Sequence, residues 1–241
     1  MSIALNGTNQ WVNLGLDLPV LRAVNGGTLM AWVRVTPGTL LGSQMLTYAT
    51  GGAGTSDLSR LAIEVNPVLT PTVRILARSQ DADGSRITAG ATSLPTGLWT
   101  HVAGVVDYVT SMEYVYFNGV LDGQAAVAAF TAPTSNTNSR NGAIGAQDTG
   151  SGGFFPGEIE DARCYGRALN EAEIATIYAA RGVDGIVAGL QARYLLNERA
   201  DGLVAVACAD ISDNQRNGSP TNSPVYVAGI LRDRRKLVKV R

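Results

Sequence analysis

Three carboxylates fall within four consecutive positions of the stretch GEIEDARCY: Glu158, Glu160 and Asp161. Glycoside hydrolases use two carboxyl groups a few ångströms apart, one as an acid and one as a nucleophile or base. In a regular strand Glu158 and Glu160 share one face, roughly 6.5–7 Å apart at a rise of ~3.3 Å per residue, which permits this chemistry. Because Ile159 then occupies the opposite face, we favour the alternative that both acids lie on a solvated polar face without a catalytic role.

Other catalytic chemistries need residues that the chain has in small number. A Ser-His-Asp arrangement must use His101, the single histidine, which lies mid-strand in WTHVAG and is expected to be packed and hydrogen-bonded. Cys164 and Cys208 are too few for a disulfide framework, so we interpret them as small buried residues, with a bridge as the alternative. One histidine and two distant cysteines also argue against a tetrahedral zinc site. The sequence therefore favours a protein that is not an enzyme.

Calcium needs only oxygen ligands, from carboxylates, amides and backbone carbonyls. Five such side chains fall near predicted strand ends: Asp81, Asp83, Asp107, Asn118 and Asp148. Their spacing matches no calcium-binding loop, and Asp and Asn also form turns by themselves. Calcium is thus the candidate cofactor, and turn formation is the favoured interpretation of these five residues.

The composition indicates strands joined by tight turns. Of 241 residues, 45% are apolar, 16% are charged and 28 are glycine, so charge is low and glycine is abundant. Apolar residues alternate with a period of two, or form strand-like runs, in the segments 28–35, 60–65, 72–78, 98–107, 113–123, 189–197 and 202–210. Within 113–123, the pair Asn118-Gly119 predicts a two-residue hairpin turn.

One segment, 169–182, has helical spacing instead. Asn170 can cap its N-terminus, Glu173 three residues later completes a capping box, and Gly182 suits its C-terminus. Ile174 and Ile177 then share a face that can be buried. The sequence predicts one short helix near residues 170–181, laid on a β-protein.

Several stretches, taken in order, resemble the laminin-G-like, concanavalin A-like jelly-roll family. They are GTLMAWVRV, LWTHVAGVVD, VYFNGVLDG and FFPGEIEDARCYGRALNEAEIATIY. The resemblance covers roughly residues 1–210 and implies an all-β, two-sheet antiparallel jelly-roll sandwich, leaving residues 211–241 as a polar loop and a basic C-terminal arm. Such domains mostly bind glycans or proteins, and some hold a calcium ion at the rim.

The resemblance also bears on individual residues. In laminarinase-type glucanases of this fold a second catalytic Glu follows the first on the same strand, but here Ala162 and Arg163 occupy those positions. Trp32, Trp99 and Phe155 fall in family markers and are expected in the core. Stacking on sugar rings would then fall to less fixed aromatic residues, namely Trp11, Tyr48 and Phe154.

The last ten residues carry six bases and one acid, a net charge of +5, in a chain whose total is −1. The bases are Arg232, Arg234, Arg235, Lys236, Lys239 and Arg241. Such an arm can contact nucleic acid or an acidic face of a neighbouring subunit. Its alternating end, KLVKVR, could add as a strand to a sheet edge, and we expect these six residues to contact a partner.

The N-terminus lacks the pattern of a signal peptide, and no stretch approaches a membrane span. No phosphate loop, dinucleotide fingerprint or nucleic-acid module is evident. The leading hypothesis is a non-enzymatic virion protein, made in the host cytoplasm: a bacteriophage capsid-decoration protein or tail adhesin. Its partners would be other virion proteins, copies of itself or a cell-surface glycan. The alternatives are a glycan-binding module, with or without calcium, and a divergent glycosidase using Glu158 and Glu160.

Overall fold

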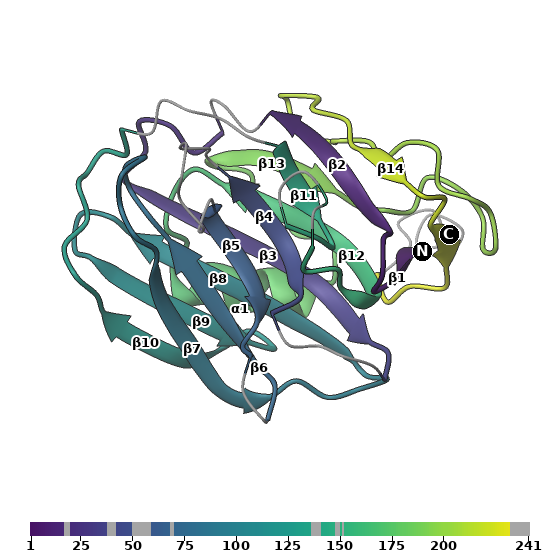
Figure 1. Ribbon diagram of the computed structural model, residues 1–241, viewed down its shortest axis with the longest axis horizontal. Helices are drawn as coiled ribbons and strands as arrows, with labels where there is room; N and C mark the ends of the chain where they lie inside the picture. The colour runs from purple at the N-terminus through teal and green to yellow at the C-terminus, as the bar shows by residue number, and fades with distance from the viewer. Residues whose placement is uncertain are drawn as a thin grey trace, which may run out of the picture.

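The alternating segments of the sequence form two antiparallel sheets stacked face to face (Figure 1). The computed structural model describes residues 1–16, 20–37, 42–49, 59–67, 70–135, 141–147, 150 and 152–231. The predicted all-β, two-sheet jelly-roll sandwich with one short helix is confirmed.

Within the described residues the two sheets have eight and seven strands, which we name sheet A and sheet B. Sheet A runs in the order β10 (Val120–Ala126), β9 (Met112–Phe117), β8 (Trp99–Asp107), β3 (Gly26–Val35), β12 (Pro156–Tyr165), β1 (Ser2–Asn6), β15 (Val225–Val227), with β13 (Leu190–Tyr194) also paired to β12. Sheet B runs in the order β14 (Ser219–Thr221), β2 (Trp11–Leu16), β11 (Asn141–Ile144), β4 (Gln44–Ala49), β5 (Ser59–Val65), β6 (Thr72–Ala77), β7 (Arg86–Ser93).

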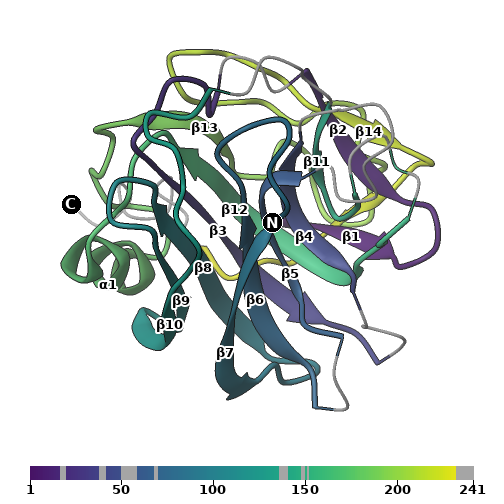
Figure 2. The ribbon, with the colours of Figure 1, turned by 60° about the vertical axis from the view of Figure 1, so that its left-hand side comes forward.

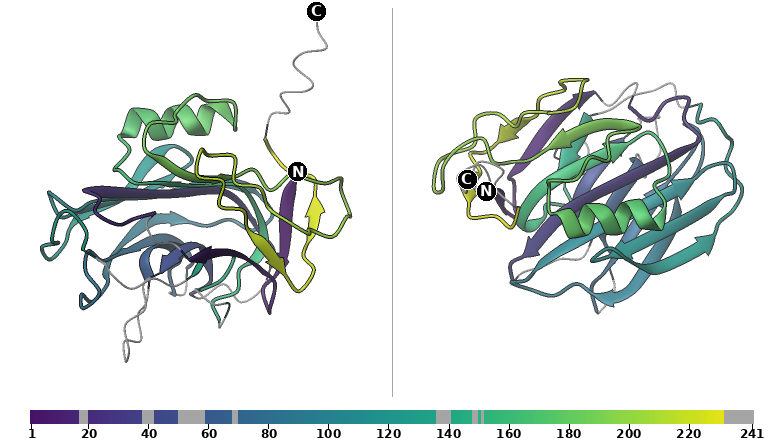
Figure 3. Two further views of the ribbon diagram at one scale, coloured as in Figure 1. Left: turned by 90° about the horizontal axis from the view of Figure 1, so that it is seen from above. Right: turned by 180° about the vertical axis from the view of Figure 1, so that it is seen from behind.

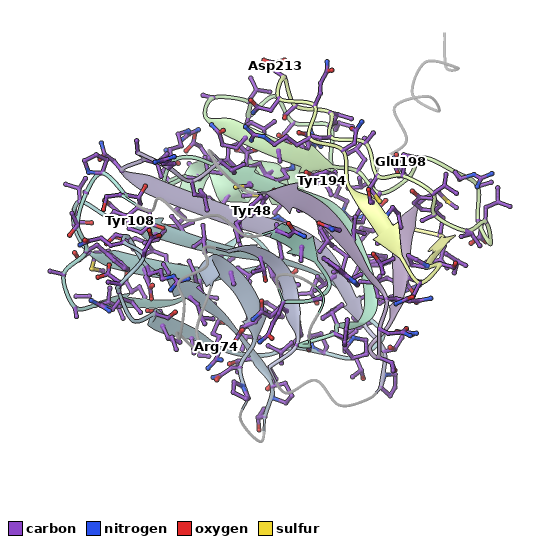
Figure 4. The ribbon with its side chains drawn as sticks, turned by 45° about the horizontal axis from the view of Figure 1, so that its top comes forward. Tyr48, Arg74, Tyr108, Tyr194, Glu198 and Asp213 are labelled. Carbon is purple, nitrogen blue, oxygen red and sulfur yellow. The ribbon has the colours of Figure 1, made fainter. Side chains whose placement is uncertain are left out.

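The main core fills the space between the sheets with alternate residues of each strand, as the period of two predicted. Leu29 and Val33 of β3 face Ile63 of β5 in this core, and all three are fully buried. Gly104 of β8 lies where the two sheets approach closely, because a Cβ there would come within 2.7 Å of the Ile63 side chain. Tyr48 and Tyr194 also belong to this core (Figure 4).

A second, smaller core lies on the outer face of sheet A, beneath helix α1 (Glu171–Ala180) (Figures 2 and 3). Ile174 and Ile177 of the helix are buried there, as predicted. The predicted capping box is also present: Asn170 Oδ1 accepts from the Glu173 N–H at 2.9 Å, and the Glu173 carboxylate accepts from the Asn170 N–H at 3.0 Å. These bonds satisfy donors that the first turn would otherwise leave unpaired.

The C-terminal part of the chain differs from the prediction. The segment 202–210 is not a regular strand; it makes isolated bridges only, at Val204 and Cys208 among others, and Val206 is 68% exposed. The segment after residue 210, predicted as a polar loop, contributes β14 to sheet B and β15 to sheet A. These strands pair with β2 and β1, whose edges would otherwise be open. Three-residue strands are too short for a period to predict them.

Three further predictions bear on single residues. Cys164 and Cys208 form no disulfide bond among the described residues, and both are buried, which confirms their interpretation as small core residues. Asp148 and the six basic residues of the arm, from Arg232 to Arg241, lie outside the described residues. Among the described helices, none is long and apolar enough to cross a membrane.

Candidate functional site

Glu158 and Glu160 lie on the outer face of sheet A, but the prediction of a solvated face is wrong. They are 9% and 0% exposed. Arg34, the neighbour of Glu158 on β3, donates to both of its carboxylate oxygens at 2.6–3.0 Å, and the Ser2 hydroxyl donates at 3.4 Å. The Glu158 carboxylate therefore forms an ion pair with Arg34 on β3 and a hydrogen bond with Ser2 on β1, the two strands beside β12.

Glu160 lies beneath the segment that follows β15. Its Oε2 accepts from the backbone N–H groups of Ile230 at 2.6 Å and Leu231 at 3.2 Å, and its Oε1 accepts from the Met1 amine at 3.1 Å. A Cβ at Gly229 would fall 2.4 Å from both carboxylate oxygens, so only glycine lets the backbone pass this closely. Burial raises the pKa of Glu160, while the amine and the two N–H groups oppose that rise. Both acids therefore hold chain segments together, and neither opens to a cleft in the described structure.

The third acid of the stretch, Asp161, belongs to a buried ion network that the sequence did not predict. A bulge in β12 places it at φ 49°, beside Arg163. Arg163 donates to Asp161 at 2.5 and 3.0 Å and to Asp184 at 2.8 and 2.9 Å, and Arg193 donates to Asp161 at 2.8 Å. Asp184 lies in the connection after helix α1, so the network ties that connection to sheet A.

His101 is packed as predicted, but its ring makes no hydrogen bond to the described residues. Its ring lies 5.3 Å from the Trp32 ring and 6.0 Å from the Tyr178 ring of helix α1, measured between centroids. Neither ring nitrogen has a hydrogen-bond partner among the described residues. Burial, with a smaller contribution from the Arg163 charge, lowers the pKa of His101 to about 3, so the ring is neutral near pH 7. This environment lacks the Ser and Asp partners that a catalytic triad requires.

The residues proposed for calcium do not come together. Asp107 ends β8, whereas Asn118 accepts from the His101 N–H at the other end of that strand, about 20 Å away at the rise of a strand. Asp81 and Asp83 lie in the turn between β6 and β7, where Asp83 Oδ2 accepts from Ser79 and Gln80. Among the described residues no three acidic, histidine or cysteine side chains are grouped to hold a metal ion. The four candidates in the described part of the chain, Asp81, Asp83, Asp107 and Asn118, therefore do not form one shared calcium site.

Aromatic residues proposed for sugar stacking are mostly inside the fold. Trp11 and Tyr48 are 7% and 2% exposed, and Phe155 is fully buried, as expected for the last of these. Phe154 is half-buried against Trp11. Trp99, expected in the core, is instead half-buried, and the Arg34 guanidinium covers one side of its ring at 5.3 Å.

An open, shallow hollow of about 520 Å³ lies at one end of the sandwich, and we call this hollow the rim pocket. It forms where β3 begins and where β8 and β12 end, and its lining comprises Ala23, Val24, Asn25, Gly26, Asp107, Val109, Thr110, Gly166, Arg167 and Ala168. Gly26 permits the close approach of these segments, because a Cβ there would lie 2.6 Å from the Ala168 nitrogen. Three segments distant in sequence therefore build the pocket.

Hydrogen bonds fix the polar walls of the rim pocket. Asp107 Oδ1 accepts from the N–H groups of Val109 at 2.9 Å and Thr110 at 3.2 Å, while Oδ2 has no hydrogen-bond partner among the described residues. The Arg167 guanidinium bonds to Glu173 at 2.6 and 2.9 Å and to the Ala188 carbonyl at 2.7 Å. A carboxylate oxygen, an amide, a hydroxyl and small apolar side chains thus line one concave surface, the mixture that suits a polar organic ligand.

The acid beside this pocket is not poised for catalysis. Hydrogen bonding from Arg167 lowers the pKa of Glu173, which keeps this carboxylate ionised. Of the residues lining the pocket, the sequence pointed only to Asp107, through its place at a strand end. Arg167 could have been found from its spacing to Glu173, but its contact with the connection after the helix could not.

Comparison with known proteins identifies the family to which the sequence belongs. A family model described as the concanavalin A-like lectin/glucanases superfamily matches residues 6–175, more than half of the chain. The chain belongs to this superfamily. No curated protein matches the sequence.

Several solved structures share the fold at low sequence identity. The heptameric SAP-like pentraxin of Limulus polyphemus is 18% identical, with a TM-score of 0.55 over 76% of this chain and 83% of the pentraxin. The CBM40 of the Ruminococcus gnavus IT-sialidase, solved with α2,3-sialyllactose, is 16% identical, with a TM-score of 0.57 over 74% of this chain and 98% of the module. A candidate carbohydrate-binding protein from Bacteroides ovatus is 17% identical, with a TM-score of 0.63 over 97% of this chain and 62% of that protein.

Proposed function

We propose that this superfamily member is a non-enzymatic carbohydrate-binding domain whose ligand occupies the rim pocket. The observation that carries the proposal is the rim pocket itself, a concavity of about 520 Å³ at the end of a lectin-like sandwich. Asp107 Oδ2, the Asn25 amide and the Thr110 hydroxyl can exchange hydrogen bonds with sugar hydroxyls, while Val24 and Val109 supply an apolar surface. The carbohydrate-binding module among the similar structures supports the same ligand class.

The absence of catalysis is part of the proposal and rests on where the acids lie. Glycoside hydrolysis needs two carboxyl groups on either side of an accessible bond. Glu158 is paired with Arg34, and Glu160 is fully buried beneath Gly229. Near the pocket, Glu173 is paired with Arg167. Each of these carboxylates has a structural partner that a substrate would have to displace.

Filling the rim pocket should weaken glycan binding. Val109 lines the pocket and is 65% exposed, and Val120 on β10 is also 65% exposed but lies outside the pocket lining. We expect Val109→Trp to weaken binding of the best ligand on a glycan array by about tenfold or more, because the indole occupies the ligand volume. Val120→Trp should leave affinity unchanged, and titration calorimetry of both variants would measure the difference.

A second variant separates charge from shape at the same site. Asp107→Asn keeps an acceptor for the N–H groups of Val109 and Thr110, so the turn is preserved, but it removes the negative charge. Reduced affinity with unchanged thermal stability would support direct recognition by this carboxylate. Unmodified protein that binds no glycan, or Val109→Trp that binds normally, would overturn the proposal. Binding that disappears with EDTA would show that a metal ion takes part in recognition.

We further propose the setting of this activity: the surface of a virion, where the domain decorates a capsid or serves as a tail adhesin. The basic arm, Arg232–Arg241, supports this assignment, since an arm of net charge +5 suits contact with neighbouring subunits. The expected result is that the protein sediments with intact particles in a density gradient, at a fixed copy number per particle. Recovery only as free protein, when particles are present in the same culture, would reject the virion setting and leave the glycan proposal standing.

A further inference from the structure

A run of apolar side chains lies exposed beside β15. We call it the apolar strip and define it as Leu203, Val204, Val206 and Ala207. The first three are 44%, 42% and 68% exposed, and Ala207 is exposed as well. Single exposed apolar residues are common, but a contiguous exposed run marks an interaction surface.

The backbone of the apolar strip forms a sheet edge whose outer N–H groups are unpaired, while the Val204 carbonyl on that side accepts from the Arg199 guanidinium at 3.1 Å. On its inner side Ala205 N–H donates to the Pro224 carbonyl at 2.8 Å, and Leu203 O accepts from the Tyr226 N–H at 2.9 Å. The N–H groups of Val204 and Val206 have no partner among the described residues. An edge with free N–H groups is a template for an added strand.

Acidic side chains flank the apolar strip. The segment 198–213 holds four acids and one base, a net charge of 1 − 4 = −3. Three of the acids, Glu198, Asp201 and Asp213, are exposed; Figure 4 labels Glu198 near the yellow C-terminal strands and Asp213 at the top of the view. An added strand that matches this edge would therefore alternate apolar and basic residues.

The end of the arm has that pattern from Val238 to Arg241, where two valines alternate with Lys239 and Arg241. The last six residues of the arm, KLVKVR, combine Leu237, Val238 and Val240 with Lys236, Lys239 and Arg241, and the ten residues from Arg232 carry +5. We propose that the arm of a second copy adds as a β-strand to the apolar strip. Its apolar side chains cover Leu203, Val204 and Val206, and its basic side chains face the flanking acids.

The course of the chain favours the arm of a second copy over the protein's own arm. The strip lies outside β15, the edge strand of sheet A. After β15 the chain turns inward across β1 to β12, where Ile230 and Leu231 donate to Glu160. Leu231 reaches the end of helix α1, since a Cβ at Gly182 would lie 3.0 Å from its side chain. The last described residue, Leu231, therefore lies on the far side of β15 and β1 from the strip.

Sedimentation velocity of the full chain over a concentration series tests the proposal. The unmodified protein should self-associate, and Val206→Arg should weaken association by about tenfold or more, because it places a like charge against the arm. Val187→Arg is the matched control, since Val187 is 67% exposed but lies in the connection after helix α1. Lys239→Glu should weaken association as well, and pairing it with Asp201→Lys should restore part of the loss.

A peptide measurement identifies the segment that binds. The peptide RDRRKLVKVR should bind the protein in a fluorescence anisotropy titration, and RRRRKKDLVV, which has the same composition without the alternation, should bind more weakly. Equal binding of the two peptides would show that charge alone drives the contact, and it would overturn the proposal that the arm adds as a β-strand. A chain that stays monomeric at every concentration would overturn the proposal, as would association that Val206→Arg leaves unchanged. These outcomes are independent of glycan binding at the rim pocket.

Discussion

Replacing Arg163 by alanine is expected to lower the free energy of unfolding by about 3–5 kcal/mol, the loss typical of removing one partner from a buried ion pair. The Arg163 side chain is fully buried and donates four hydrogen bonds to Asp161 and Asp184. Without it both carboxylates lose their main counter-charge. Burial by itself would raise the pKa of Asp161, but the Arg163 and Arg193 guanidinium groups outweigh burial and hold that pKa below its usual value.

Chemical denaturation of Arg163→Ala beside Arg167→Ala would measure this loss. Arg167 also pairs with a carboxylate, that of Glu173, but their side chains are 32% and 22% exposed. A solvated pair of this kind typically contributes up to about 1 kcal/mol. Equal losses in the two variants would show that burial adds nothing to the network at Arg163. The network also anchors the connection after helix α1. We therefore expect the backbone amides of residues 183–189 to exchange their hydrogens faster in Arg163→Ala than in the unmodified protein.

The second large effect is a pH-dependent loss of stability caused by Glu113. This carboxyl group on β9 is fully buried between the sheets, where Thr88 of β7 donates to Oε2 at 2.8 Å and Oε1 has no partner among the described residues. Burial raises the pKa of Glu113 from 4.5 to about 7, against smaller opposing effects of Thr88 and Arg86. The folded state therefore binds a proton that the unfolded state has released between pH 4.5 and 7.

Because the folded state holds the extra proton, the contribution of Glu113 to stability is full below pH 4.5 and is lost as pH rises through 7. A difference of this size corresponds to about 3 kcal/mol. His101 acts in the opposite direction: its pKa is lowered to about 3, so its neutral, buried form gains stability as pH rises from 3 to 6.5. The two effects partly cancel in the unmodified protein between pH 4.5 and 6.5.

Comparison of Glu113→Gln with the unmodified protein isolates the carboxyl group from His101. The variant should be more stable at pH 8 by up to about 3 kcal/mol, and this advantage should vanish near pH 4. Denaturant titrations at a series of pH values would measure it, with Glu171→Gln on the exposed start of helix α1 as control. A constant difference across the pH range would contradict a raised pKa at Glu113.

Most of the fold could be predicted from local patterns in the sequence. Leu29 and Val33 alternate because successive side chains of a strand face opposite ways, so the core of sheet A could be predicted from spacing alone. The helix was equally local, since Asn170 and Glu173 cap it within three residues of each other. The burial of the two cysteines was predicted from their small number and their apolar neighbours in the sequence.

Only the tertiary structure showed that Glu160 is buried and that the ends of distant strands form the rim pocket. Glu160 has the same local pattern in a solvated strand and in a buried one, and only Ile230 and Leu231, 70 residues away in sequence, remove it from water. The rim pocket likewise joins Gly26, Asp107 and Arg167, whose sequence separation hides their proximity. The apolar run at 203–207 was predicted as a strand because its composition is strand-like, but β15 meets it at one bridge, and its outer N–H groups have no partner among the described residues. By itself the sequence determined which elements form, because backbone periodicity is local. Burial, pairing and concavity depend on which distant segments meet, and so they were settled only by the folded chain.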